Sequence, residues 1–284
     1  MARLPVRIIL TLIVASSVGA YSQGIPAASG KISAAEILKK NLIASRGLEA
    51  RQSLQSLSAR GDVFLSTFPL HMMGDYSFSY KSPSSDVLGM KMVSHGTCWS
   101  GRREGQKTVT KCGVEGPGMI EGVSIQIVER DWRSLVEWDF SRDYDKIELI
   151  GRAEVEKRWA YAVRFTPHEG DPQVRFYDYE TFLLVRMDQV QRFRWNKNDP
   201  EVAYSVTSYF REYKDHAGMK LPRVIAVRRG EGDLLFRLST IHPNAKIADS
   251  VFELGTPECT EAFQWTGALE TSERNCAEAE KNAK

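Results

Sequence analysis

The sequence predicts a mainly β protein, built on one long antiparallel sheet between about residues 57 and 254. Apolar and polar side chains alternate through this region, as in residues 75–80 and 159–165, where the aromatic side chains fall on one face. Such period-two alternation is typical of a sheet with one apolar and one solvated face. Clusters of Gly, Pro, Asn and Asp separate the alternating runs, as at residues 168–172 and 230–233. These are turn residues, so most neighbouring strands should form hairpins, and the sheet should be a meander.

Twelve strands are expected. They lie near residues 58–66, 75–81, 86–94, 97–100, 106–112, 145–152, 157–167, 173–180, 183–192, 202–213, 219–229 and 233–242.

Helical patterns are few. Ser33 and Glu36 form a capping-box pattern at the start of a helix whose apolar stripe includes Leu38 and Leu42, and Gly47 is placed to end it. A short helical turn is expected over 48–54. Between residues 113 and 145 the alternation breaks, and Val128, Trp132, Leu135 and Val136 fall at helical spacing, which predicts a helix over 124–138. The start of this helix could instead be extended, because Val123, Ile125 and Ile127 alternate.

The first twenty residues predict export. Arg3 and Arg7 precede an apolar run, and small residues follow at 18–20, the pattern of a secretory signal peptide cleaved near Ala20. The apolar run has roughly 10 residues, whereas a membrane-spanning helix needs about 20. We therefore expect a signal peptide at 1–20, a flexible lead at 21–32, one domain at 33–255, an acidic tail at 256–284, and a periplasmic location.

Four cysteines in an exported chain predict disulfides. Three pairings are possible, and we favour Cys98 with Cys112 and Cys259 with Cys276. Cys98 and Cys112 flank a turn rich in Gly and Arg, and facing strands bring Cα atoms to bridging distance. The alternative, a Cys98 nucleophile beside His95, is disfavoured in an oxidising compartment.

Motifs for catalysis, phosphate binding and metal binding are missing from the sequence. There is no HExxH, CxxC, GxSxG or P-loop pattern. We therefore predict no enzyme activity, no cofactor and no metal. Asp178 lies near two other carboxylates, but its setting is that of a hairpin residue bonded to its own backbone. The formal net charge of +2 favours no nucleic acid partner.

The apolar face of the sheet is the remaining candidate site. It has few helices to cover it, so part of it should remain as a cleft for a hydrophobic ligand. The candidate ligand-binding residues are Tyr76, Phe78, Tyr80, Leu88, Met90, Met92, Trp159, Tyr161, Phe165, Phe176, Leu234, Phe236 and Leu238.

The order of the elements, together with two stretches, 176–184 and 209–222, and the segment 244–252 that follows them, resembles the outer-membrane lipoprotein-sorting proteins of the LolA/LolB-like superfamily. The resemblance covers about residues 33–255. It implies an unclosed β-barrel, a single strongly curved antiparallel sheet with two or three helices as a plug or lid. It also implies an apolar hollow for lipoprotein acyl chains or other lipids.

These implications give the functional expectation. The protein would be a monomeric periplasmic carrier or binder of lipoprotein or lipid, with membrane-bound donor and acceptor proteins as further partners. The alternative is a non-transport sensor or interaction module with the same fold. The two expected disulfides and the tail depart from the superfamily pattern.

Overall fold

The structure, a computed structural model, describes residues 32–45, 48–67, 70–81, 85–92, 96–102, 109–113, 119–193, 201–216, 218–229 and 232–252. The expected signal peptide, most of the lead, Gly47, Cys259, Cys276 and the tail lie outside these residues. The segment around His95 does as well.

All twelve expected strands are present in the described part of the chain. They are β1 (Ser56–Thr67), β2 (Leu70–Lys81), β3 (Ser85–Met92), β4 (Gly96–Arg102), β5 (Val109–Gly113), β6 (Tyr144–Val155), β7 (Arg158–Pro167), β8 (Gln173–Asp178), β9 (Leu184–Phe193), β10 (Val202–His216), β11 (Met219–Arg229) and β12 (Gly232–Pro243). They form one sheet in the order β5-β4-β3-β2-β1-β12-β11-β10-β9-β8-β7-β6, antiparallel throughout.

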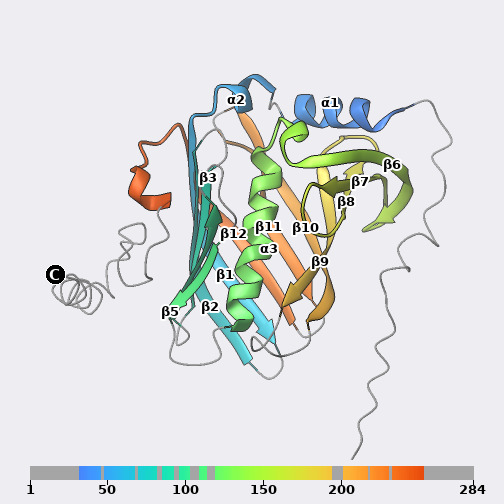
Figure 1. The fold of residues 1–284 in the computed structure, drawn as a ribbon. Helices are drawn as coiled ribbons and strands as arrows, with labels where there is room; N and C mark the ends of the chain where they lie inside the picture. The colour runs from blue at the N-terminus through green and yellow to red at the C-terminus, as the bar shows by residue number, and fades with distance from the viewer. Residues whose placement is uncertain are drawn as a thin grey trace, which may run out of the picture.

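The sheet is therefore two meanders joined at the middle. The first strand, β1, pairs with the last, β12, so that Val63 lies opposite Phe236. The edges are β5 and β6, which are consecutive in the chain, and the sheet is open between them. The segment that connects the two edges must cross the whole sheet, and it does so as α3 (Met119–Val136). Figure 1 shows the sheet curving around this helix.

The expected helix over 124–138 is confirmed, and it begins earlier than predicted. Residues 123–127 are helical rather than extended. Val128, Trp132, Leu135 and Val136 are all buried in the main core between α3 and the concave face of the sheet. The helical spacing of these four side chains thus identifies the face that packs on the sheet.

Helices α1 (Ala34–Ala44) and α2 (Leu48–Gln52) lie across one end of the curved sheet (Figure 1). The predicted capping box is present: Glu36 N donates to Ser33 Oγ at 3.2 Å, and Ser33 N donates to Glu36 Oε2 at 2.8 Å. The buried Arg51 links the segments at this end. It donates to the backbone oxygen of Glu137, which follows α3, at 3.0 Å, and to Ser45 Oγ at 3.1 Å.

Candidate functional site

The concave face of the sheet is apolar, and α3 lies against it. Trp132 is fully buried, and its ring stacks on Phe78 with centroids 5.2 Å apart and planes at 17°. Tyr76 contacts both Trp132, at 6.2 Å, and Phe236, at 5.2 Å. The wall is therefore continuous from β2 across β1 to β12, and Trp132 occupies the hollow in front of it.

Most of the predicted ligand-binding residues belong to this wall. Nine of them are buried together in the main core: Tyr76, Phe78, Tyr80, Leu88, Tyr161, Phe165, Leu234, Phe236 and Leu238. The side chains of Met90 and Met92 lie outside the described part of the structure. Their backbone is in β3, where Met90 pairs with Tyr76 and Met92 with Gly74.

Phe176 and Trp159 do not lie with these nine residues. Phe176 is buried in a second cluster with Ala160 and Ala162, which alternate along β7 with the core residues Tyr161 and Val163 and therefore face the other way. A register shift follows Phe176 in the β8–β9 pairing. Trp159, near the start of β7, is 55% exposed. Trp159 shares the face of Tyr161 but lies at the exposed start of its strand. On β8 the alternation is kept, but the inward positions are Arg175 and Tyr177, so the apolar side chains did not identify the concave face.

The other face of α3 meets β9 and β10 through polar groups. Asp131 is fully buried, and its Oδ1 accepts a hydrogen bond from Gln189 Nε2 at 3.2 Å. Burial raises the pKa of Asp131 to about 7, although the Ser208 hydroxyl and Arg130 act in the opposite direction. Three buried side-chain atoms of the same helix, Glu129 Oε2, Asp131 Oδ2 and Trp132 Nε1, have no hydrogen-bond partner in the described structure. An unpaired buried polar atom costs about 1–3 kcal/mol, so the packing of α3 is not optimised for stability.

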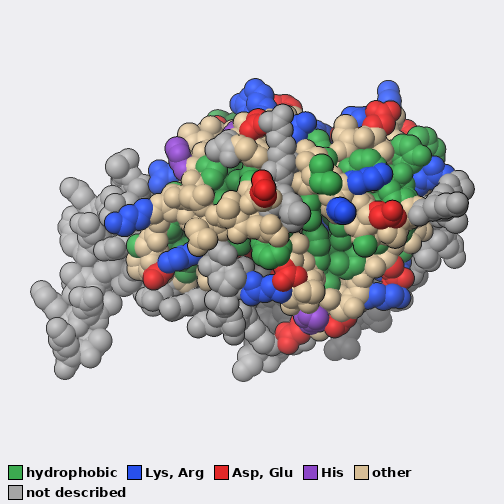
Figure 2. Space-filling model, turned by 90° about the horizontal axis from the view of Figure 1, so that it is seen from above, with side chains coloured by type: hydrophobic (Ala, Val, Ile, Leu, Met, Phe, Trp, Pro, Cys, Tyr) green, Lys and Arg blue, Asp and Glu red, His purple; other side chains and the backbone are tan. Residues whose placement is uncertain are grey.

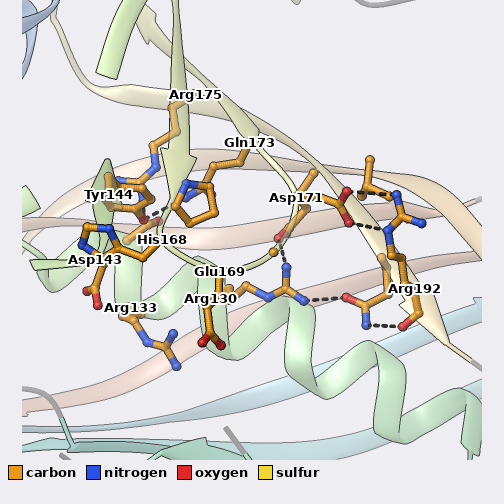
Figure 3. Close-up of a pocket in the computed structure, with 16 residues that line it drawn as sticks. Arg130, Arg133, Asp143, Tyr144, His168, Glu169, Asp171, Gln173, Arg175 and Arg192 are labelled. Atoms are coloured by element: carbon orange, nitrogen blue, oxygen red, sulfur yellow. Dashed lines mark hydrogen bonds and ion pairs between the residues drawn. The ribbon is translucent and has the colours of Figure 1, made fainter. Parts of the chain in front are cut away.

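A polar pocket of about 610 Å³ opens beside this seam, between the second half of α3 and strands β6, β8 and β9. Figure 3 shows Arg130 and Arg133 on the α3 side, and Tyr144, Gln173 and Arg175 on the strand side. The turn between β7 and β8, which contains His168 and Asp171, closes another side. A pocket of this volume can hold a small molecule or a lipid head group.

Arg175 links this pocket to the apolar core. Its guanidinium donates to Glu137 Oε2 at 3.0 Å and to Tyr144 Oη at 2.5 Å, and it lies 4.1 Å from the Phe165 ring centroid. Burial lowers the pKa of Arg175, but Tyr144 and Glu137 outweigh that effect, and the pKa is raised. Arg175 is therefore a fixed cation at the boundary between the polar pocket and the aromatic core.

This pocket was not predicted from the sequence. The signal was available, because Gln189 and Gln191 continue the inward-facing positions of β9 after the buried Met187, and Arg175 lies between outward-facing Val174 and Phe176. Polar residues at inward positions of two neighbouring strands indicate a polar lining. These residues form no named motif.

Asp178 has the structural role predicted for it. It is buried, and its Oδ1 accepts from Thr181 N at 2.7 Å and from Thr181 Oγ1 at 2.8 Å, while Arg158 donates to the same carboxylate at 3.0 Å. This carboxylate holds the turn between β8 and β9.

The backbone register bears on the first expected disulfide. Cys98 on β4 lies directly opposite Cys112 on β5. The disulfide itself stays a prediction, as does the pairing of Cys259 with Cys276. Across the described residues, His, Cys, Asp and Glu side chains do not gather in any group of three that could hold a metal ion.

The end of the molecule that carries α1 and α2 has a mixed surface. Figure 2 looks down on it and shows hydrophobic side chains between Lys, Arg, Asp and Glu. Ile43 of α1 is 63% exposed. None of the helices in the described part of the chain is both long enough and apolar enough to span a membrane.

The structure thus defines an open antiparallel half-barrel with a helix in its hollow. Comparison with solved structures finds the same fold in a DUF1329 family protein from Desulfovibrio piger ATCC 29098, with a TM-score of 0.51 and 13% identity, over 77% of this chain and 96% of that one. A LolA superfamily protein from Nitrosomonas europaea gives a TM-score of 0.47 and 11% identity, over 78% and 98% of the two chains. An outer-membrane lipoprotein-sorting protein domain from Vibrio parahaemolyticus gives 0.49 and 10%, over 76% and 97%.

The resemblance to the LolA/LolB-like superfamily that the sequence indicated is thereby confirmed as a resemblance of fold. No protein-family model and no curated protein sequence matches the chain.

Proposed function

We propose that this protein is an exported carrier or binder of a hydrophobic ligand, the acyl chain of a lipid or lipoprotein, and that the ligand occupies the apolar hollow when α3 moves aside. The observation that carries the proposal is that α3 covers the aromatic wall, with the Trp132 ring on Phe78 and Tyr76. That helix also meets β9 and β10 through a polar seam with unpaired buried atoms.

The energies of the two arrangements are comparable. The four apolar side chains that α3 places in the core contribute roughly 1.5–3 kcal/mol each, or roughly 6–12 kcal/mol together. An acyl chain gains about 0.8 kcal/mol for each buried CH₂, and thus roughly 10 kcal/mol for a chain of about twelve carbons. A ligand chain can therefore replace the contacts that α3 gives up. Because the two free energies are similar, α3 can also displace the ligand again, and a carrier must be able to release its ligand.

The export signal and the implied ligand class support the same function. A signal peptide at 1–20 would deliver the protein to the compartment where lipoproteins are sorted. The fold resemblance implies acyl chains as the ligand. A non-transport sensor with the same hollow is the second candidate, and it would hold its ligand without passing it to an acceptor membrane.

The test is the binding of a fluorescent fatty-acid probe to the mature protein, with Trp132→Ala as the informative variant. Removing the Trp132 ring removes the largest side chain with which α3 competes against the ligand, so the probe should bind about tenfold more tightly while the free energy of unfolding falls. Trp159→Ala, which changes an exposed ring, is the matched control and should alter neither quantity. A wild-type protein that binds no probe, and a Trp132→Ala variant that binds none either, would refute the proposal.

Met92→Glu extends this test to the part of the wall on β3. If Met92 lines the hollow, a carboxylate there should lower probe affinity more than the stability measured by urea unfolding, because a cleft wall can hydrate. If Met92 is packed core, the variant should lose several kcal/mol of stability.

A further inference from the structure

The polar pocket contains four arginines, and carboxylates in contact neutralise three of them. Arg133 donates to Asp86 at 3.0 and 3.1 Å and also to Glu129. Arg175 donates to Glu137 at 3.0 Å.

Arg192, the third of these, donates to Asp171 at 2.6 and 3.0 Å and to Glu201 at 3.3 Å. The Arg192–Asp171 pair is visible at the right of Figure 3. These three arginines are committed to structural ion pairs, and they offer a ligand little.

Arg130 differs from the other three. Its guanidinium donates to two neutral amide oxygens, Gln191 Oε1 at 2.7 Å and Gln189 Oε1 at 3.4 Å. Burial lowers the pKa of Arg130, because keeping this cation away from water is unfavourable. The amide oxygens accept from two of its donors, and among the described residues no carboxylate forms an ion pair with this guanidinium.

We propose that Arg130, with Gln189 and Gln191, forms a site for a monoanionic head group, a phosphodiester or a carboxylate, of the amphiphile whose acyl chain occupies the apolar hollow. This inference rests on the proposed function, in which the acyl chain binds in the apolar hollow. The polar pocket would then bind the head group. A guanidinium is planar and binds the oxygens of carboxylates and phosphates in pairs. Gln191 can also turn, so that its NH₂ group donates to an arriving anion, whereas Gln189 keeps its NH₂ group on Asp131.

The position of the pocket suits an amphiphile. Tyr144 and Arg175 line the pocket, and both lie against Phe165 of the main core, with the Tyr144 and Phe165 rings 5.0 Å apart. A ligand that crosses this boundary would have its charged end in the pocket and its chain in the core. The pocket is also open to solvent, so a head group can enter without unfolding the sheet.

The surrounding carboxylates limit the charge of the ligand. Asp143, Glu169 and Asp171 line the same pocket, and Asp131 lies behind Arg130 on α3. A dianion would meet like charges within a few ångströms, whereas a single negative charge can be balanced by Arg130. The pocket should therefore prefer a monoanion to a phosphomonoester.

The experiment compares ligands that share one lauroyl chain. Lysophosphatidylglycerol carries a net charge of −1, and monolauroylglycerol carries none. By calorimetry or displacement of the fatty-acid probe, the wild type should bind the anionic ligand at least about tenfold more tightly than the neutral one, the magnitude expected for one charged hydrogen-bonded contact. Dimethyl phosphate, the free head-group chemistry without a chain, should compete weakly with the first ligand and not with the second.

The variants identify the residue. Arg130→Gln should lower affinity for the anionic ligand to that for the neutral one and leave the neutral ligand unchanged. Arg211→Gln removes the same charge from an exposed ion pair with Glu156 outside the pocket, and it should change neither affinity. Gln191→Glu would place a fixed carboxylate against Arg130, and it should abolish the preference without weakening the fold. Gln191→Glu therefore tests the role of Arg130 in anion binding if Arg130→Gln does not fold.

The failures are distinguishable. Equal wild-type affinity for both lauroyl ligands, or equal effects of Arg130→Gln on both, would overturn the head-group site and leave the acyl-chain binder in place. Binding of dimethyl phosphate at Arg130, with neither lauroyl ligand bound, would show an anion site in a protein that does not bind acyl chains. If none of the three ligands binds, both proposals fail.

Discussion

The Trp132 ring on α3 stacks on the Phe78 ring on β2, with centroids 5.2 Å apart, and both side chains are fully buried. This contact joins the helix that connects the two edges of the sheet to a strand near its middle. It follows that the position of α3 determines whether the aromatic wall is accessible. The Trp132 ring and another apolar group cannot cover Phe78 at the same time.

A double-mutant cycle on Phe78 and Trp132 should detect this contact. Each change to Ala should cost about 3–5 kcal/mol in the free energy of unfolding, and the coupling between the two should be about 0.5–1.5 kcal/mol. Urea unfolding of the two single variants and the double variant measures it. The cycle of Phe78 with Phe165 is the control, because Phe165 makes its ring contacts with Phe140 and Tyr144 instead. Strict additivity at Phe78 and Trp132 would show that the stacking contributes nothing beyond burial.

Asp131 should make stability depend on pH in a defined direction. Burial raises its pKa to about 7 in the folded state, from an ordinary value of 3.8. The folded protein therefore holds this proton more tightly than the unfolded chain. The contribution of Asp131 to stability is complete below about pH 4, is lost as pH rises towards 7, and changes no further above that. The loss is at most roughly 4 kcal/mol.

The measurement is urea unfolding of wild type and Asp131→Asn between pH 4 and 8. Asparagine keeps an oxygen for Gln189 and cannot ionise, so the variant should gain stability relative to wild type as pH rises through this range. Glu36→Gln is the contrasting variant: hydrogen bonds from Ser33 lower the pKa of Glu36 from its ordinary value of 4.5, so their benefit is lost only as pH falls below that value, and its difference from wild type should be nearly constant across most of this range. A difference between Asp131→Asn and wild type that is constant with pH would contradict the assigned cause.

Gly61 is required where β1 meets β12. A Cβ atom at this position would lie 2.0 Å from Arg237 O and 2.7 Å from Tyr76 Cε1, next to the register shift between Arg60 and Gly61. The first neighbour is backbone and cannot turn away, so Gly61→Ala should cost more than about 3 kcal/mol and displace the central strand pair. Gly170→Ala is the control. Gly170 has φ +99° with open space around it, so only local backbone strain of about 1–2 kcal/mol is expected. Equal melting temperatures for the two variants would argue against the clash.

The local elements of this fold and the hairpin order of its strands could be predicted from the sequence, but the joining of the two meanders through β1 and β12 could not. Ser33 and Glu36 signal a helix start through contacts within four residues, and the alternation around Phe78 signals a strand in the same local way. The pairing of Val63 with Phe236 joins positions far apart in the chain, and no local pattern encodes it. The polar lining of the pocket had a local signal in Gln189 and Gln191, but their contact with Arg130 had none, because α3 reaches these side chains only after it has crossed the sheet.

A disulfide should join the two strands at one edge of the sheet. Cys98 and Cys112 are directly opposed in the β4–β5 ladder, an arrangement that brings Cα atoms within the range a disulfide requires. The two strands lie at the edge of the sheet and β5 has five residues, so besides the disulfide this hairpin depends on β3 and on the packing of α3 against it. In the chain-entropy model a bond that closes a loop of about 15 residues stabilises by roughly 3 kcal/mol.

Non-reducing peptide mapping of protein purified from an oxidising compartment should therefore recover Cys98 joined to Cys112 and Cys259 joined to Cys276. Dithiothreitol and the double variant Cys98→Ser/Cys112→Ser should lower the melting temperature to a similar extent, while Cys259→Ser/Cys276→Ser, which alters a pair in the tail, should change it less. Four free thiols, or a peptide that joins Cys98 to a tail cysteine, would refute the pairing and return Cys98 to consideration as a reactive thiol.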